Sequence, residues 1–154
     1  QGLQIQRDSL VNQVQSNLVT GCTAVINEEL AIKALPIPAH AIMHDWWIAI
    51  AAVAYGKRLF IDQPLVRYRQ HDANAIGAQP FVAVAPSAKS LWGKIRAYQI
   101  NPHLFAVAEQ SHAVLRHHSG ALSLRQRLGL QLLGCVNVRS GLLQSLLFRL
   151  ARFF

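Results

Sequence analysis

The sequence has little negative charge, few cysteines and no long apolar run. Its 154 residues hold seven Asp and Glu against fifteen Lys and Arg, and Cys22 and Cys135 form no C-x-x-C or C-x-x-H pattern. The cysteines therefore indicate neither a disulfide framework nor a zinc ribbon, and a pair of reduced thiols is the simpler interpretation. The longest strongly apolar stretch, residues 46 to 56, is far shorter than the ~20 residues of a membrane-spanning helix.

The first ten residues also lack the apolar core of a signal peptide, because they are polar and include Asp8. We therefore expect a cytoplasmic location. With 52% hydrophobic residues, the chain is apolar enough to form a core, which excludes disorder as its main state. Its charge is unevenly divided: residues 1 to 80 hold six basic and six acidic side chains, whereas residues 81 to 154 hold nine basic side chains and only Glu109. This asymmetry is typical of two functional units, or of one unit with a basic docking tail.

Three segments of the first half predict short β-strands. Residues 17 to 26 are rich in β-branched and small side chains, with Gly21 at a position where a strand bends or a ligand approaches the backbone. Residues 59 to 62 and 65 to 69 are short apolar runs separated by a Gln-Pro pair. Strands interspersed with helices predict an α/β fold for this half.

Local signals predict the helices. Asn27 stands at the N-cap position of a short helix that ends before Pro36. Residues 46 to 55 are apolar on every face, which predicts a buried helix ended by Gly56. The second half is expected to be helical at about residues 87 to 100, 102 to 117, 123 to 134 and 140 to 154. We therefore divide the chain into an α/β part, residues 1 to 85, and a basic helical part, residues 86 to 154.

Asp45 is the most informative of the few carboxylates, because it precedes the buried helix. A carboxylate at a helix N-terminus accepts free backbone N–H groups, so Asp45 could serve only as an N-cap. It could also be a general base that deprotonates a hydroxyl, with Trp46 and Trp47 excluding water around it. The two roles are compatible.

Residues 68 to 74, with the sequence YRQHDAN, concentrate polar side chains where the last predicted strand ends. Strand ends in α/β proteins are common ligand sites. Arg69 could pair with a phosphate, and His71 could bind a metal or share a proton. From spacing alone, a hydrogen-bonded loop histidine is the favoured explanation of His71.

Four motifs together resemble the acceptor-side half of bacterial family 2 glycosyltransferases, the rhamnosyltransferase-like enzymes of surface polysaccharide synthesis in particular. These motifs are TGCT at residues 20 to 23, HDWW at 44 to 47, IDQPLVRYRQH at 61 to 71 and NAIG at 74 to 77. Their order and spacing are much more specific than any one of them alone. The resemblance implies a partial GT-A domain, which is a Rossmann-like nucleotide-diphospho-sugar transferase fold, followed by a mainly helical C-terminal region.

The resemblance also implies roles for individual residues. Asp45 would be the base of an inverting transfer from a nucleotide-sugar donor to a saccharide or lipid-linked glycan acceptor. His71 would complete a site for a divalent metal, Mg²⁺ or Mn²⁺. The residues expected to bind substrate are Thr20, Gly21, Cys22, Thr23, His44, Trp46, Trp47, Arg69, Gln70 and Asn74.

The sequence departs from this family in one respect that matters for activity. These enzymes begin with a nucleotide-binding half that ends in an Asp-x-Asp metal motif, and no D-x-D occurs in the 154 residues. A hard cation prefers oxygen ligands, and this chain offers no obvious carboxylate pair for one. We therefore expect a glycosyltransferase segment that is inactive without such a half. The alternative is a non-catalytic membrane-surface or partner-binding module with a degenerate transferase fold.

The C-terminal residues 141 to 154 predict an amphipathic helix with leucines and phenylalanines on one side and Arg149 and Arg152 on the other. This apolar face could pack inside the protein, or it could lie on an anionic membrane at the inner face of the bilayer. The arginines are scattered singly among apolar residues and match no recognition motif, which argues against nucleic acid as the partner.

Overall fold

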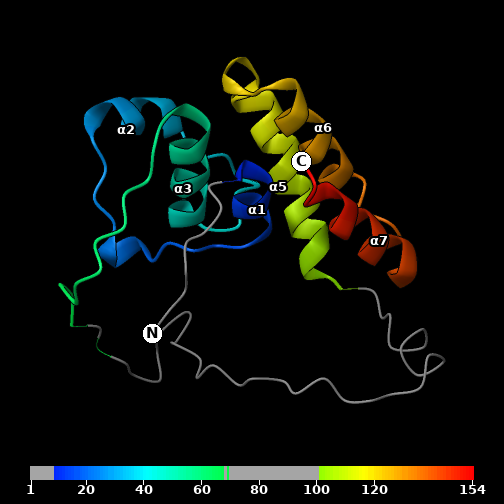
Figure 1. Cartoon of the computed structure of the whole chain (residues 1–154), viewed down its shortest axis with the longest axis horizontal. Helices are drawn as coiled ribbons and strands as arrows, with labels where there is room; N and C mark the ends of the chain where they lie inside the picture. The colour runs from blue at the N-terminus through cyan, green and yellow to red at the C-terminus, as the bar shows by residue number, and fades with distance from the viewer. Residues whose placement is uncertain (1–8, 68, 70–100) are drawn as a thin grey trace.

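The computed structural model describes residues 9–67, 69 and 101–154. Within these residues the chain forms six α-helices, two 3₁₀ turns and no β-strand (Figure 1). In chain order they are α1 (Leu10–Gln15), η1 (Gly21–Thr23), α2 (Glu28–Ala34), α3 (His44–Tyr55), α5 (His103–His117), η2 (Ser119–Ala121), α6 (Leu124–Gly134) and α7 (Gly141–Ala151). The part of the chain that the structure describes is therefore all-helical.

The predicted α/β fold with a Rossmann-like GT-A domain is wrong for this part of the chain. Residues 17 to 26 consist of non-helical stretches on either side of η1, and residues 57 to 67 are irregular. A strand requires hydrogen bonds to a neighbouring strand, and none of the described residues supplies that neighbour. Apolar side chains of these segments are instead left open to solvent: Val25 is 98% exposed and Leu59 is 89% exposed.

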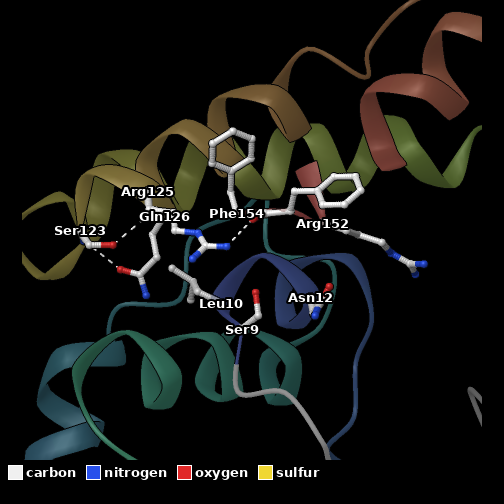
Figure 2. A pocket seen from close by; sticks show the side chains of 9 residues that line it. Ser9, Leu10, Asn12, Ser123, Arg125, Gln126, Arg152 and Phe154 are labelled. Atoms are coloured by element: carbon white, nitrogen blue, oxygen red, sulfur yellow. Dashed lines mark hydrogen bonds between the residues drawn. The ribbon is translucent and has the colours of Figure 1, made fainter. Parts of the chain in front are cut away.

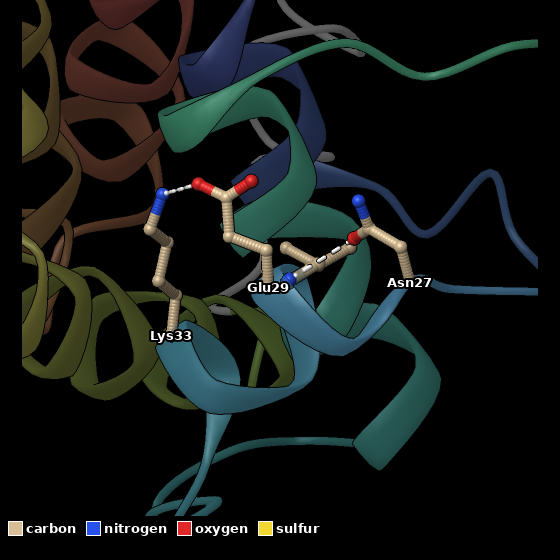
Figure 3. Close-up of polar contacts among 4 residues, drawn as sticks. Asn27, Glu29 and Lys33 are labelled. Carbon is tan, nitrogen blue, oxygen red and sulfur yellow. Dashed lines mark hydrogen bonds and ion pairs between the residues drawn. The ribbon is translucent and has the colours of Figure 1, made fainter.

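Helix α2 begins where its cap residue predicts. The side-chain oxygen of Asn27 accepts the Leu30 backbone N–H at 3.0 Å, which satisfies one of the free donors of the first turn (Figure 3). One turn apart on the surface of α2, Lys33 donates to the Glu29 carboxylate at 2.5 Å. The hydrogen bond and the positive charge of Lys33 lower the pKa of Glu29. The predicted helix and its N-cap are thus confirmed.

The predicted helix over residues 46 to 55 is confirmed as α3, although it begins two residues earlier, at His44. Gly56 follows its last residue as predicted, and the Gly56 N–H donates to the Ala52 carbonyl at 3.0 Å. Burial is less complete than the sequence indicates, because Tyr55 is exposed at the end of the helix. The buried residues are Asp45, Trp46, Trp47, Ala49, Ile50, Ala51 and Ala52.

Three of the four helices predicted for the second half are confirmed as α5, α6 and α7, each within a few residues of the expected bounds. The fourth, residues 87 to 100, lies outside the described residues. Ser123 and Gln126 form a capping box at the start of α6: the Ser123 hydroxyl accepts the Gln126 N–H, and the Gln126 side chain accepts the Ser123 N–H. Helix α6 packs against both α5 and α7 (Figure 1).

Helix α1 joins the two groups of helices. It contacts α3 on one side and α5 and α6 on the other (Figure 1). The apolar core consists of Leu10, Val11, Val14, Ala34, Trp46, Trp47, Ile50, Ala51, Val107, Ala113, Val114, Leu122, Leu130, Leu133 and Ala151. Residues from both sides of the predicted boundary at residue 85 therefore share one core, while the boundary itself lies outside the described residues.

Gly129 allows α6 to approach α1 and the end of α7 closely. A Cβ atom at this position would lie 2.6 Å from Val11 Cγ2 and 2.8 Å from Phe154 Cβ, both well inside van der Waals contact. Protein cores are packed as densely as organic crystals, so Val11 and Phe154 have no free space into which both could move. Any side chain at residue 129 must therefore separate the three elements.

We expect Gly129→Ala to lower the free energy of unfolding by about 1–3 kcal/mol, the usual cost of overpacking a core. Urea denaturation of the wild type and the variant measures this difference. Gly120→Ala is the matched control, because a Cβ atom at Gly120 meets nothing within 4 Å. Equal effects of the two substitutions would contradict a close approach at Gly129.

Candidate functional site

Asp45 lies in the first turn of α3 and is only 7% exposed. Met43, not Asp45, occupies the N-cap position, although the Asp45 carboxylate does accept a backbone N–H of the first turn as the N-cap interpretation expects. The carboxylate accepts three N–H groups. Oδ1 accepts from the Trp46 backbone at 2.7 Å and from the Asn17 side chain at 3.1 Å, and Oδ2 accepts from the Gly21 backbone at 2.9 Å. These contacts join the start of α3 to the segment around η1.

The TGCT segment and the HDWW segment meet at Gly21. A Cβ atom on Gly21 would lie 3.0 Å from His44 Nε2, 3.2 Å from Asp45 Cβ and 3.4 Å from Asp45 Oδ2. The imidazole of His44 and the carboxylate of Asp45 therefore both pack closely against Gly21. His44 is exposed.

The other residues of η1 turn toward solvent. The Thr23 hydroxyl donates to the Thr20 carbonyl at 2.8 Å, which closes the 3₁₀ turn. Cys22 is exposed and its thiol is free, as is that of Cys135. The structure thus brings Gly21, His44 and Asp45 together, with Thr20, Cys22 and Thr23 at the edge of the group.

Both tryptophans of the HDWW motif point into the core. The Trp46 indole N–H donates to the Gln13 carbonyl at 2.5 Å, and the Trp47 indole N–H donates to the Ala34 carbonyl at 2.9 Å. They are 4% and 1% exposed. Within the described structure their contribution to the site is to fix the position of Asp45, and a direct contact with substrate stays a prediction.

The remaining predicted site residues are largely beyond what the structure describes. Arg69 is exposed and belongs to no helix. Gln70, His71 and Asn74 lie outside the described residues. Among the residues that are described, no three His, Cys, Asp or Glu side chains lie close enough to hold a metal ion. The oxygens of Asp45 accept N–H groups, so the donor set at this site does not fit a hard cation.

A carboxylate oxygen can accept two hydrogen bonds, and Oδ2 of Asp45 accepts one from the described residues. Oδ2 therefore keeps the capacity to accept a proton or a hydroxyl group beside Gly21 and His44. The arrangement suits general base chemistry on a hydroxyl, because a fixed carboxylate oxygen lies next to an exposed imidazole.

A second group of titratable side chains, which the sequence does not reveal, surrounds Trp47. The His118 ring lies 4.9 Å from the Trp47 ring, and His117 approaches it edge-on at 5.7 Å between centroids. His118 Nδ1 lies 3.2 Å from the Tyr55 hydroxyl, and Nε2 is buried without a hydrogen-bond partner. Burial, and to a lesser extent the nearby charge of His117, lower the pKa of His118 to about 4.

The lowered pKa of His118 predicts loss of stability in acid. The unfolded chain binds a proton at His118 near pH 6.5, whereas the folded chain does so only near pH 4, so stability falls as the pH drops through this window. We expect a loss on the order of 2 kcal/mol by pH 4 from this residue. Thermal melts between pH 4 and pH 7 measure it.

His118→Gln should flatten this pH dependence, because the amide keeps a polar partner for Tyr55 and does not titrate. His40→Gln at an exposed loop position provides the matched control. An unchanged acid limb in the His118 variant would contradict a neutral, buried imidazole.

A second hollow lies between α1, the start of α6 and the C-terminal residues (Figure 2). Its volume is about 570 Å³, and Arg125, Arg152 and Phe153 form part of its wall. The Arg125 guanidinium donates to the Phe153 carbonyl, and Arg152 Nε donates to the Gln15 side chain at 3.0 Å. The hollow is separate from Asp45 and carries positive charge.

Searches of protein-family models, curated proteins and solved structures find no match to this chain. The resemblance to family 2 glycosyltransferases therefore stays a prediction from its four motifs. Among the described residues, no helix is both long and apolar enough to cross a membrane.

Proposed function

We propose that this chain is the acceptor-side segment of an inverting glycosyltransferase, with Asp45 as the base. The donor would be a nucleotide sugar and the acceptor a saccharide or a lipid-linked glycan, in the synthesis of a surface polysaccharide. The observation that carries the proposal is the hydrogen bond of 2.9 Å from the Gly21 N–H to Asp45 Oδ2.

This contact supports the proposal because it joins two of the four motifs. Gly21 and Asp45 are 24 residues apart in the sequence, and the TGCT and HDWW motifs were linked only by their resemblance to one family. A shared site requires them to be close in space. The lack of a Cβ atom on Gly21 favours the approach, since a Cβ atom there would lie 3.0 Å from His44 Nε2 and 3.2 Å from Asp45 Cβ, and these neighbours would have to move by a few tenths of an ångström.

In the proposed reaction, Asp45 Oδ2 takes the proton of an acceptor hydroxyl, and the oxygen forms a bond to the anomeric carbon of the donor sugar. The bond from that carbon to the nucleotide diphosphate breaks, and its electron pair leaves on the diphosphate oxygen. Attack from the side opposite the leaving group inverts the configuration at the anomeric carbon. Asp45 ends protonated and loses the proton to solvent before the next cycle.

The other residues would support this step. Thr20, Cys22, Thr23 and His44 border the acceptor, while Trp46 and Trp47 hold α3 in place. Arg69, Gln70, His71 and Asn74 would lie near the diphosphate.

Mg²⁺ or Mn²⁺ would neutralise charge on the leaving group in the complete enzyme, with His71 and carboxylates from a nucleotide-binding half as ligands. The sequence contains no D-x-D motif, so we expect the chain alone to be inactive. We propose that the complete enzyme works in the cytoplasm, at the inner face of the membrane.

A second candidate function is a non-catalytic binding module, and the burial of Asp45 favours it. The carboxylate is almost enclosed and already accepts three N–H groups, as expected of a residue that merely fastens η1 to α3. The two candidates differ in one measurable respect, since only a base needs a carboxylate that can take up a proton.

We expect Asp45→Asn to lower kcat by about 10²–10⁴-fold in a protein that joins this chain to a nucleotide-binding half. An amide cannot accept the acceptor proton at neutral pH, whatever its position. Release of nucleoside diphosphate from a panel of nucleotide sugars and glycan acceptors measures the rate, and the isolated chain should show no turnover.

Asn17→Ala is the matched control, because it removes a hydrogen bond to the same carboxylate and leaves the carboxylate itself in place. Thermal melts of both variants report any loss of folding. A rate for Asp45→Asn that is no lower than that for Asn17→Ala would exclude Asp45 as the base and leave the binding module.

A further inference from the structure

Helix α7 turns its apolar side toward solvent. Leu142, Leu143, Leu146 and Leu150, which we call the leucine face, are between 41% and 57% exposed. At ~100° per residue they occupy one side of the helix within an arc of about 100°. On the opposite side α7 buries Gln144 and Ala151, and the half-buried Phe148 packs against the core. A surface helix in a globular protein usually buries its whole apolar stripe, whereas α7 leaves these four leucines open to solvent.

The polar contacts of Gln144 hold α7 in this orientation. Its side-chain oxygen accepts the Asn101 N–H at 2.9 Å, and its amide nitrogen donates to the Val136 carbonyl at 3.2 Å and to the Asn101 carbonyl at 3.4 Å. Gln144 is 1% exposed. Turning the leucine face inward would expose this amide and leave the Asn101 and Val136 groups without their partner, so the leucine face stays outside.

Positive charge lies beside the leucine face and at its C-terminal end. From residue 110 to the last residue the sequence contains six arginines and no Asp or Glu. Arg149 is exposed one residue before Leu150. Arg152 follows the helix, and Arg125 of α6 donates to the Phe153 carbonyl beside it. These two arginines also line the hollow at the C-terminal end of α7 (Figure 2). An apolar face with arginines beside it complements an apolar surface that carries negative charge.

We propose that α7 lies flat on an anionic phospholipid bilayer. The leucine face enters the boundary between headgroups and acyl chains, and Arg149, Arg152 and Arg125 face the lipid phosphates. The helix has 11 residues and is therefore about 16 Å long, too short to cross the bilayer, so it binds parallel to the surface. This docking surface is independent of Asp45 and of any transfer activity.

The test is flotation of the full chain with two kinds of vesicle, one of phosphatidylcholine alone and one of phosphatidylcholine mixed with phosphatidylglycerol. We expect the protein to float with the anionic vesicles and to remain behind with the neutral ones. Raising the salt from about 0.1 M to about 1 M should release it, because the screening length falls from roughly 10 Å to 3 Å.

Two variants test the residues. Leu142→Gln combined with Leu146→Gln should weaken binding at least ten-fold, since it removes the centre of the leucine face. Arg149→Gln should weaken it roughly five-fold. The matched controls are Ile32→Gln and Arg116→Gln, which change exposed side chains on α2 and α5. All five substituted residues are exposed, so circular dichroism should show the wild-type fold throughout.

Equal binding to both vesicles, no binding to either, or wild-type binding by the α7 variants would overturn the proposal. So would a wild-type dimer that the leucine variants convert to a monomer, because the face would then serve a second copy of the chain. Asp45→Asn should bind vesicles as the wild type does, which separates this result from the outcome of the transfer assay.

Discussion

The described structure depends on the burial of two adjacent indoles at the start of α3. Consecutive residues on a helix point about 100° apart, so Trp46 and Trp47 reach different neighbours. Trp46 donates to α1 and stacks on His103 at the beginning of α5, while Trp47 donates to the end of α2 and packs on His118 just beyond the end of α5. Two side chains thereby connect α3 to three other helices. Indole side chains are well suited to connecting helices, because each one buries a large apolar ring and also makes a directional hydrogen bond through its N–H group.

The position of Asp45 follows from the same burial. Once Trp46 and Trp47 are fixed in the core, the side chain of Asp45 must lie on the side of α3 that faces η1. There its carboxylate meets three N–H donors, and Gly21 lies close to both Asp45 and His44. The indoles thus fix the position of the Asp45 carboxylate from within the core. In the sequence, Trp46 and Trp47 resemble the wall of an aromatic pocket. In the structure they are core residues that position the carboxylate of Asp45.

The sequence predicts the helices of this protein well and its extended segments poorly, for a physical reason. Helix limits depend on neighbouring residues, such as the cap at Asn27 and the stop at Gly56, so they can be read locally. A strand depends on a partner distant in the chain, and residues 17 to 26 and 57 to 67 have none among the described residues. The meeting of Gly21 with Asp45 was expected only from a family resemblance, and the environment of His118 had no local signal, because it arises from packing between α3 and α5.

Among the described residues, exposed apolar side chains lie both on non-helical segments and on helices, and the two cases differ in the hydrogen bonding of the backbone. Around Val25 and Leu59 the apolar side chains belong to non-helical chain, whose N–H and C=O groups need hydrogen bonds from water or from another protein. Lipid cannot provide those bonds. The leucine face belongs to a helix, in which the backbone N–H and C=O groups form hydrogen bonds with one another. Such a helix can enter an apolar phase without losing these hydrogen bonds. The same exposed hydrophobicity therefore suits a protein partner or solvent in residues 57 to 67 and a membrane surface at α7.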